Sequence, residues 1–215
     1  MVSGHHRDAV KIGTVGAPTL GAEHRVADNG ELLLRGDMVF AGYYKNDEAT
    51  AQSIRDGWLH TGDVVREEDG HLRIVDRLKD IMITAGGKNL TPSEIENTMK
   101  GSPYIKECVI VAEGRKFVGA LIQIDDETVG KWAEAERIPF THFRSLVEQP
   151  RVRELIDAEV AKGNARLAQV SQIRRFHLLV KELDHDDGDV TATMKVRRSS
   201  ITKTYAAEIE ALYGA

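Results

Sequence analysis

Turn signals between short apolar runs do most to limit the fold of the first third of the chain. Asp28-Asn29-Gly30 and Glu68-Asp69-Gly70 each separate two runs of β-forming residues. Asn and Gly accept the positive φ of tight turns, so both tripeptides predict hairpins. A helix is expected over 46–54, with Asn46 or Asp47 as N-cap. The expected strands are 13–15, 23–27, 31–34, 38–40, 57–60 and 71–75, which together predict a small antiparallel β unit.

From Asp80 onward the pattern changes to alternating strands and helices. Thr91-Pro92-Ser93-Glu94 predicts a helix start, with Pro92 in the first turn and a capping box between Thr91 and Glu94. The acidic stretch 184–189 is expected to be a solvated loop, and the last helix carries an apolar side ending at Leu212. Strands are expected over 81–84, 108–112, 117–124 and 176–180, and helices over 91–100, 126–137, 150–167 and near the C-terminus. The predicted fold class is α+β, with a small antiparallel β unit over 1–78 and a compact α+β domain over 79–215.

Composition excludes several classes of protein. The chain has 215 residues, a net charge of -5 and a pI near 5.9, so no overall basic field predicts nucleic-acid binding. The single cysteine, Cys108, excludes an internal disulfide and is expected to be buried. The eight histidines show no metal-ligand spacing, so no metal site is predicted. No apolar run approaches the roughly 18 residues of a membrane span, and a cytoplasmic location is expected.

Charged candidates lie in the middle of the chain. Asp63 is expected on a turn, where its carboxylate could bind a vicinal diol such as a ribose, or could bond its own backbone. Arg77 and Lys79 are two residues apart, so in an extended chain they point to the same side and could meet phosphate oxygens. The alternative for this pair is an exposed charged linker.

Two further segments have open alternatives. Gly86-Gly87-Lys88 could let a ligand approach the backbone, or could be a plain hairpin turn, and the chain has no Walker phosphate-loop pattern. Lys195 lies in the polar, basic segment 188–198. A mobile lysine there could act as a point charge against a phosphate, or the segment could be a surface strand with a basic edge.

Taken together, these segments resemble the C-terminal part of the adenylate-forming enzymes, the superfamily of acyl-CoA synthetases, luciferases and adenylation domains. The resemblance covers nearly the whole chain. The matching segments are Gly30-Glu-Leu-Leu-Leu-Arg-Gly36 with 39–44, Asp56-Gly-Trp-Leu-His-Thr-Gly-Asp63, and Asp76-Arg-Leu-Lys-Asp80 followed by 87–96. The turn 83–89 and the segment Thr191-Ala-Thr-Met-Lys195 look most like long-chain fatty acyl-CoA synthetases. Met194 stands where many members have Gly.

The resemblance implies that 1–78 is the β-rich end of the large N-terminal AMP-binding domain and 79–215 the C-terminal lid domain, with a hinge near Lys79. It implies a reaction in which a fatty acid and ATP give an acyl-adenylate, and CoA then displaces AMP. Mg²⁺ would accompany ATP, and neither ATP nor CoA is expected to bind tightly to this chain alone.

The resemblance also implies roles for single residues. Asp63 would hold the ribose hydroxyls, Arg77 would contact the nucleotide near its ribose and phosphate, and Lys195 would neutralise charge as the carboxylate attacks the α-phosphate. The turn would face the active site in the thioester-forming state; its residues are Gly86, Gly87, Lys88 and Asn89.

The superfamily's phosphate loop and its Tyr-Gly-x-Thr-Glu segment are absent from these residues. The chain is therefore expected to be a fragment of a fatty acid–CoA ligase, inactive without an upstream N-terminal domain. The alternatives are a stand-alone interaction or regulatory module, and a ligase that loads an acyl carrier protein. Exposed apolar surface on the β unit is expected to favour a homodimer. Peripheral membrane association stays open.

Overall fold

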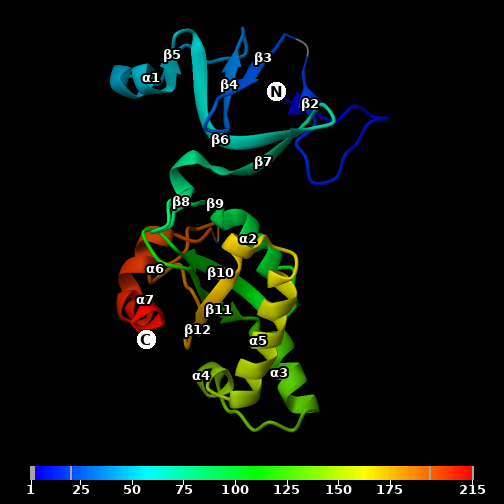
Figure 1. The fold of residues 1–215 in the computed structure, drawn as a ribbon, viewed down its shortest axis with the longest axis vertical. Coiled ribbons are helices and arrows are strands. Elements are labelled where there is room, and N and C mark those ends of the chain that lie inside the picture. The colour runs from blue at the N-terminus through cyan, green and yellow to red at the C-terminus, as the bar shows by residue number, and fades with distance from the viewer. Residues whose placement is uncertain (1–2, 20, 194, 215) are drawn as a thin grey trace. The chain divides into compact units, whose positions relative to one another are not determined.

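The structure, a computed structural model, describes residues 3–19, 21–193 and 195–214. The chain divides into two compact units, one up to Ile81 and one from Met82 onward (Figure 1). This division lies three residues after the boundary expected from the sequence. The boundary lies later because the short 3-10 helix η1, Leu78–Asp80, belongs as a whole to the first unit.

The first unit is built around one long strand, β6 (Trp58–Glu68). The first half of β6 lies between β4 and β5, and its second half pairs with β7, all antiparallel. Asn46 caps α1 as expected, because its Oδ1 accepts a hydrogen bond from Ala49 N at 3.0 Å. The other elements of the described part are β1 Ser3–Gly4, β2 Ala17–Pro18, β3 Glu23–Val26, β4 Glu31–Arg35, α1 Asp47–Ser53, β5 Ile54–Arg55 and β7 His71–Arg77.

Three strand predictions in this unit are corrected by the structure. Residues 13–15 and 38–40 are not strands, because glycines with positive φ bend the chain beside them, Gly13 at +84° and Gly36 at +136°. The strand expected to end at residue 60 continues to Glu68. Asp63 therefore lies on a strand and not on a turn. Gly62, with φ of +70°, is accommodated inside the strand because β7 pairs with the residues that follow it.

The second unit is an α+β fold around a three-stranded sheet of order β10, β11, β12. β10 and β11 form an antiparallel hairpin, and β11 and β12 are parallel. A short hairpin of β8 and β9 comes before this sheet in the chain. The elements described are β8 Met82–Ile83, β9 Asn89–Leu90, α2 Pro92–Met99, β10 Ile105–Val111, β11 Val118–Ile124, α3 Asp126–Ala135, α4 Phe143–Val147, α5 Pro150–Asn164, η2 Gln169–Ser171, β12 Ile173–Leu178, α6 Arg198–Thr204 and α7 Ala206–Tyr213. The α+β class expected from the sequence is confirmed.

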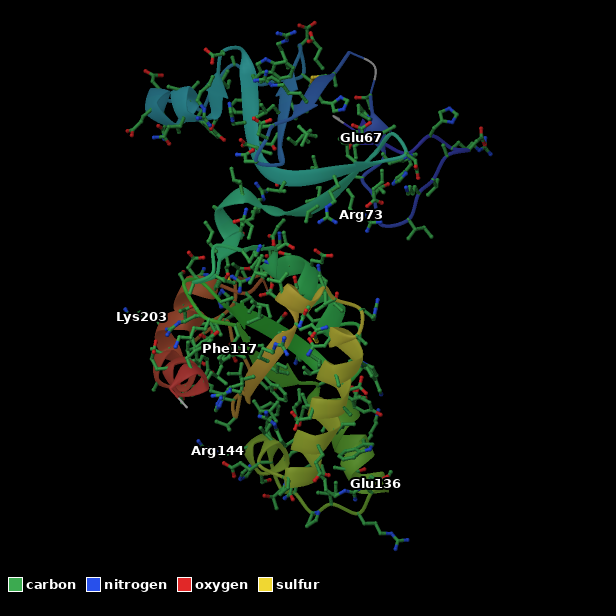
Figure 2. The ribbon with its side chains drawn as sticks, in the orientation of Figure 1. Glu67, Arg73, Phe117, Glu136, Arg144 and Lys203 are labelled. Atoms are coloured by element: carbon green, nitrogen blue, oxygen red, sulfur yellow. The ribbon has the colours of Figure 1, made fainter. Side chains whose placement is uncertain are left out.

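Helices cover both faces of this sheet, so every residue of β11 is buried. One core joins Cys108, Ile110 and Ile122 to α2, α3 and α5, and the other joins Val109 and Leu121 to α6 and α7. The helix sets lie on opposite sides of the sheet in Figure 1, and Lys203 of α6 and Glu136, just after α3, are labelled on those sides in Figure 2. Cys108 is buried as expected, and burial raises the pKa of its thiol well above the usual value.

Several local predictions for this unit are wrong in detail. Thr91 is the N-cap of α2, but its hydroxyl donates to the Glu94 carboxylate at 3.0 Å, so no side-chain hydrogen bond caps the backbone. The final helix is two helices, which meet at Tyr205. Asp189 is buried although the stretch 184–189 was expected to be solvated, because α6, which follows it, belongs to the core. The sequence did not predict α4.

Candidate functional site

Asp63 and Arg77 lie side by side as cross-strand partners on β6 and β7. Arg77 Nε is 2.9 Å from Asp63 Oδ1. The Arg77 side chain is 57% exposed and the Asp63 side chain 26%, so water screens the pair and it contributes little to stability. An exposed ion pair of this kind can exchange partners with a bound ligand. The Asp63 carboxylate thus pairs with a cation on the neighbouring strand. This arrangement differs from the alternative of a turn aspartate whose carboxylate bonds its own backbone.

The backbone beside Asp63 is held by buried groups that the sequence did not single out. The buried carboxylate of Glu31 accepts a hydrogen bond from Gly62 N at 2.9 Å, and its other oxygen lies 2.9 Å from His60 Nδ1. Thr61 Oγ1 donates to Leu32 O at 2.7 Å and accepts from Asp63 N at 3.1 Å. These bonds fix the kink at Gly62 and thereby the direction of Asp63. The only sequence signal for Glu31 was a charged residue at the start of an apolar run.

A cavity of about 350 Å³ lies at the end of β7, lined by Gly62, Arg77, Leu78 and Lys79. Lys79 is exposed within η1, two residues before the division between the units. The predicted residues Asp63, Arg77 and Lys79 therefore belong to one edge of the first unit. A cation beside a carboxylate on a hollowed edge is suited to a ligand that carries both hydroxyl and phosphate groups.

Residues 84–88 form the closing loop of the β8–β9 hairpin. Thr84 closes the loop twice, because its N donates to Lys88 O at 3.0 Å and its Oγ1 accepts from Lys88 N at 3.1 Å. Gly87 has φ of +72° and nothing within 4 Å of the position a Cβ would take. The turn is thus a plain hairpin in shape, and its glycine backbone is open to solvent.

Lys195 closes a small loop before α6. Thr191 N donates to Lys195 O at 2.8 Å, and Lys195 N donates to Thr191 Oγ1 at 3.1 Å. The Lys195 side chain is exposed, and its ammonium has no ion-pair partner among the residues that the structure describes. An antiparallel bridge between Val190 and Val196 flanks the loop, so Lys195, next to Val196, presents its cation from the strand-like base of the loop. Met194, the departure noted in the sequence, lies outside the described residues.

Residues 79–215 match the family model described as "AMP-binding enzyme C-terminal domain". The chain belongs to this family. Long-chain-fatty-acid–CoA ligase FadD15 of Mycobacterium tuberculosis is 40% identical over 206 residues, which are 95% of this chain and 34% of the relative. The peroxisomal long chain acyl-CoA synthetase 7 of Arabidopsis thaliana is 30% identical over 94% of this chain and 31% of the relative. The chain thus spans about a third of the length of these relatives.

Solved structures show the same fold. The A domain of carboxylic acid reductase from Segniliparus rugosus, in complex with AMP and a co-purified carboxylic acid, superposes with a TM-score of 0.75. It is 21% identical, and the likeness covers 92% of this chain and 32% of that one. At this identity the likeness shows the fold alone, which this chain shares with that A domain.

No helix in the described ranges has the length and apolar character to cross a membrane. No three His, Cys, Asp or Glu side chains within those ranges are grouped so as to hold a metal ion.

Proposed function

We propose that this chain is the C-terminal third of an ATP-dependent long-chain fatty acid–CoA ligase. The observation that carries the proposal is the 40% identity to a named ligase over 95% of the chain. In the complete protein a fatty acid and ATP give an acyl-adenylate and pyrophosphate, and CoA then takes the acyl group and releases AMP. ATP, with Mg²⁺, and CoA are substrates of that complete protein.

In the adenylate-forming step Asp63, Arg77 and Lys195 are the acting residues. The carboxylate of Asp63 accepts hydrogen bonds from the ribose hydroxyls, and Arg77 turns from Asp63 toward the nucleotide near its ribose and phosphate. The ammonium of Lys195 stabilises the negative charge that develops on the α-phosphate oxygens during attack. The exposure of Arg77 and the unpaired state of the Lys195 ammonium among the described residues support these roles.

The thioester-forming step uses the hinge and the hairpin loop. Lys79 is the hinge, about which residues 79–215 rotate between the two steps. The hairpin loop then faces the active site, where its open glycine backbone lets CoA approach closely. The residues assigned to this face are Gly86, Gly87 and Lys88 of the loop and Asn89 at the start of β9. The position of Lys79 in a three-residue helix just before the division of the units supports the first assignment.

Joining the chain to the upstream two thirds of FadD15 tests the proposal. The joined protein is expected to form acyl-CoA from ATP, a long-chain fatty acid and CoA, whereas the 215-residue chain alone is expected to give no pyrophosphate exchange. Lys195→Ala in the joined protein should lower pyrophosphate exchange by roughly 100-fold, the usual effect of losing one transition-state charge contact. A folded joined protein without activity would favour the stand-alone module. Preference for a phosphopantetheinylated carrier protein over CoA would favour the carrier-loading ligase.

A cytoplasmic location stays a prediction, since the relative from Arabidopsis thaliana is named peroxisomal. The proposed dependence of activity on an upstream domain is supported by the coverage, since the chain spans only about a third of the length of these relatives.

A further inference from the structure

Arg198, Glu96 and Ile110 form one hydrogen-bonded group in the second unit. Arg198 Nη2 is 2.7 Å from Glu96 Oε1, and Arg198 Nη1 donates to Ile110 O at 2.8 Å. Ile110 N donates to the same Glu96 oxygen at 2.8 Å. The side chains are only 27% and 13% exposed, for Arg198 and Glu96 respectively. The group therefore joins α6, α2 and β10 through charge-assisted bonds in a largely dry place.

The group completes the edge of the sheet. β10 is the outer strand of the order β10, β11, β12, so Ile110 has no further strand to bond with on that side. Glu96 accepts its N–H and Arg198 donates to its C=O, which satisfies both backbone groups. Removing Arg198 would leave the Glu96 carboxylate without its cation and Ile110 O without its donor. The start of α6 would then lose its connection to β10.

The same connection holds the base of the Lys195 loop. Arg197 N, next to Arg198, donates to Asp189 O at 2.8 Å across the base, and Thr191 N donates to Lys195 O at 2.8 Å nearer the tip. Lys195 is three residues before Arg198, and three residues span at most about 10 Å. A fixed Arg198 therefore restricts the volume in which the Lys195 ammonium can move.

We propose that Arg198 and Glu96 are positioning residues for Lys195. The proposal rests on the proposed function of Lys195. The ion pair holds the loop so that the ammonium meets the α-phosphate of ATP, and it acts in adenylate formation and not in thioester formation. A preorganised charge contributes to the rate only if its place is set before the charge develops, and a misplacement of about 1 Å can cost roughly 100-fold.

Amide hydrogen exchange on the 215-residue chain tests the positioning without any activity. In Arg198→Ala the amides of Thr191 and Arg197 are expected to exchange at least about tenfold faster, while those of β11 keep their protection. Arg198→Lys keeps the charge but loses the planar guanidinium group, so it should give an intermediate increase in the exchange rate. This variant replaces Arg198→Ala in the test if Arg198→Ala does not fold. Unchanged exchange at the loop, or faster exchange throughout the unit in both variants, would overturn the proposal.

Lys100→Ala is the matched control. The Lys100–Glu107 pair, 2.8 Å apart and 34% and 20% exposed, also joins the end of α2 to β10, and neither of its residues belongs to α6. Its loss should leave the exchange of Thr191 and Arg197 unchanged.

The two half-reactions of the joined ligase give the second readout. Arg198→Ala is expected to lower pyrophosphate exchange at least about tenfold and to change thioester formation from supplied acyl-adenylate by less than about twofold. Lys100→Ala should change neither. An equal fall in both half-reactions would show a structural role only. If Lys195→Ala leaves pyrophosphate exchange unchanged, the proposed function fails, and the amide exchange still decides whether Arg198 orders the loop.

Discussion

Asp189 carries a buried carboxylate at the base of the Lys195 loop. Its side chain is 2% exposed, and its Oδ1 has no hydrogen-bond partner among the described residues. Burial, and after it the negative charge of Asp187, raises the pKa of the Asp189 carboxyl above its usual value, while Lys181 partly opposes this. Burying a carboxylate with one oxygen left without a hydrogen bond costs free energy. At neutral pH this residue therefore destabilises the second unit.

Asp189→Asn is expected to raise the free energy of unfolding by about 1 kcal/mol at neutral pH, because it removes the buried charge. A carboxyl whose pKa is raised in the folded state stabilises that state when it is protonated. This contribution to the free energy of unfolding is complete below the usual pKa and is lost as pH rises through the folded-state pKa. The advantage of the Asn variant should therefore shrink on acidification toward the usual pKa. Urea unfolding at neutral and acidic pH measures it.

Asp186→Asn is the control, because the Asp186 side chain is 97% exposed. It should change stability little at either pH. A loss of stability in Asp189→Asn that is the same at both pH values would contradict the expected cost of the buried charge.

At the scale of one element, α3 shows how a cap couples stability to pH. Asp125 is the N-cap, and its Oδ1 accepts from Thr128 N at 2.9 Å. Hydrogen bonds from Thr128, from its side chain first and its backbone second, lower the pKa of the Asp125 carboxyl. The buried side of the helix, with Val129 and Ala133, packs on the main core.

Asp125→Ala is expected to lower the free energy of unfolding by about 1 kcal/mol at neutral pH. A carboxyl whose pKa is lowered in the folded state stabilises that state when it is ionised. This contribution to the free energy of unfolding is complete at pH values above the usual pKa and is lost as pH falls through the folded-state pKa. The loss should therefore fade in acid, as followed by thermal or urea unfolding. Asp125→Asn keeps a capping oxygen without the charge, so it should retain most of the stability and show no titration from this site. Equal losses in both variants would show that the cap hydrogen bond is not the cause.

Elements with strong local signals were predicted well from the sequence. The cap at Asn46 and the helix predicted over 126–137, which is observed over 126–135, depend on residues within about four positions of each other. A short-range pattern was therefore enough to predict them. The prediction failed where pairing with a distant strand decided the outcome. β6 runs through Gly62 because β7 supplies partners beyond it, and no local signal carries that information.

At the scale of the whole molecule, the first unit exposes large apolar side chains. Ile12 is 92% and Tyr44 87% exposed, and Phe40 and Tyr43 form a partly exposed ring pair with centroids 5.0 Å apart. Among the residues that the structure describes, its core cluster is small, with four buried residues and two partly buried ones packed on them. Exposed apolar surface of this kind favours association with another surface.

The 215-residue chain is therefore expected to self-associate in solution, and Ile12→Ser with Tyr44→Ser is expected to shift it toward the monomer. Sedimentation velocity over a range of protein concentrations measures the change. Val170→Ser, at an exposed apolar residue of the second unit, is the control and should leave the distribution unchanged. A chain that stays monomeric at every concentration would contradict the expected homodimer.

The sequence by itself determined the α+β class, the change of pattern near residue 80 and the family, because turns, caps, periodicity and signature segments are properties of neighbouring residues. Only the tertiary structure decided that Asp63 meets Arg77 across two strands, that Asp189 is buried, and that Glu96 meets Arg198, 102 positions later in the chain. The physical reason is that a local pattern depends on side chains a few positions apart. A contact between distant residues depends on which surfaces the packed sheet and helices bring together.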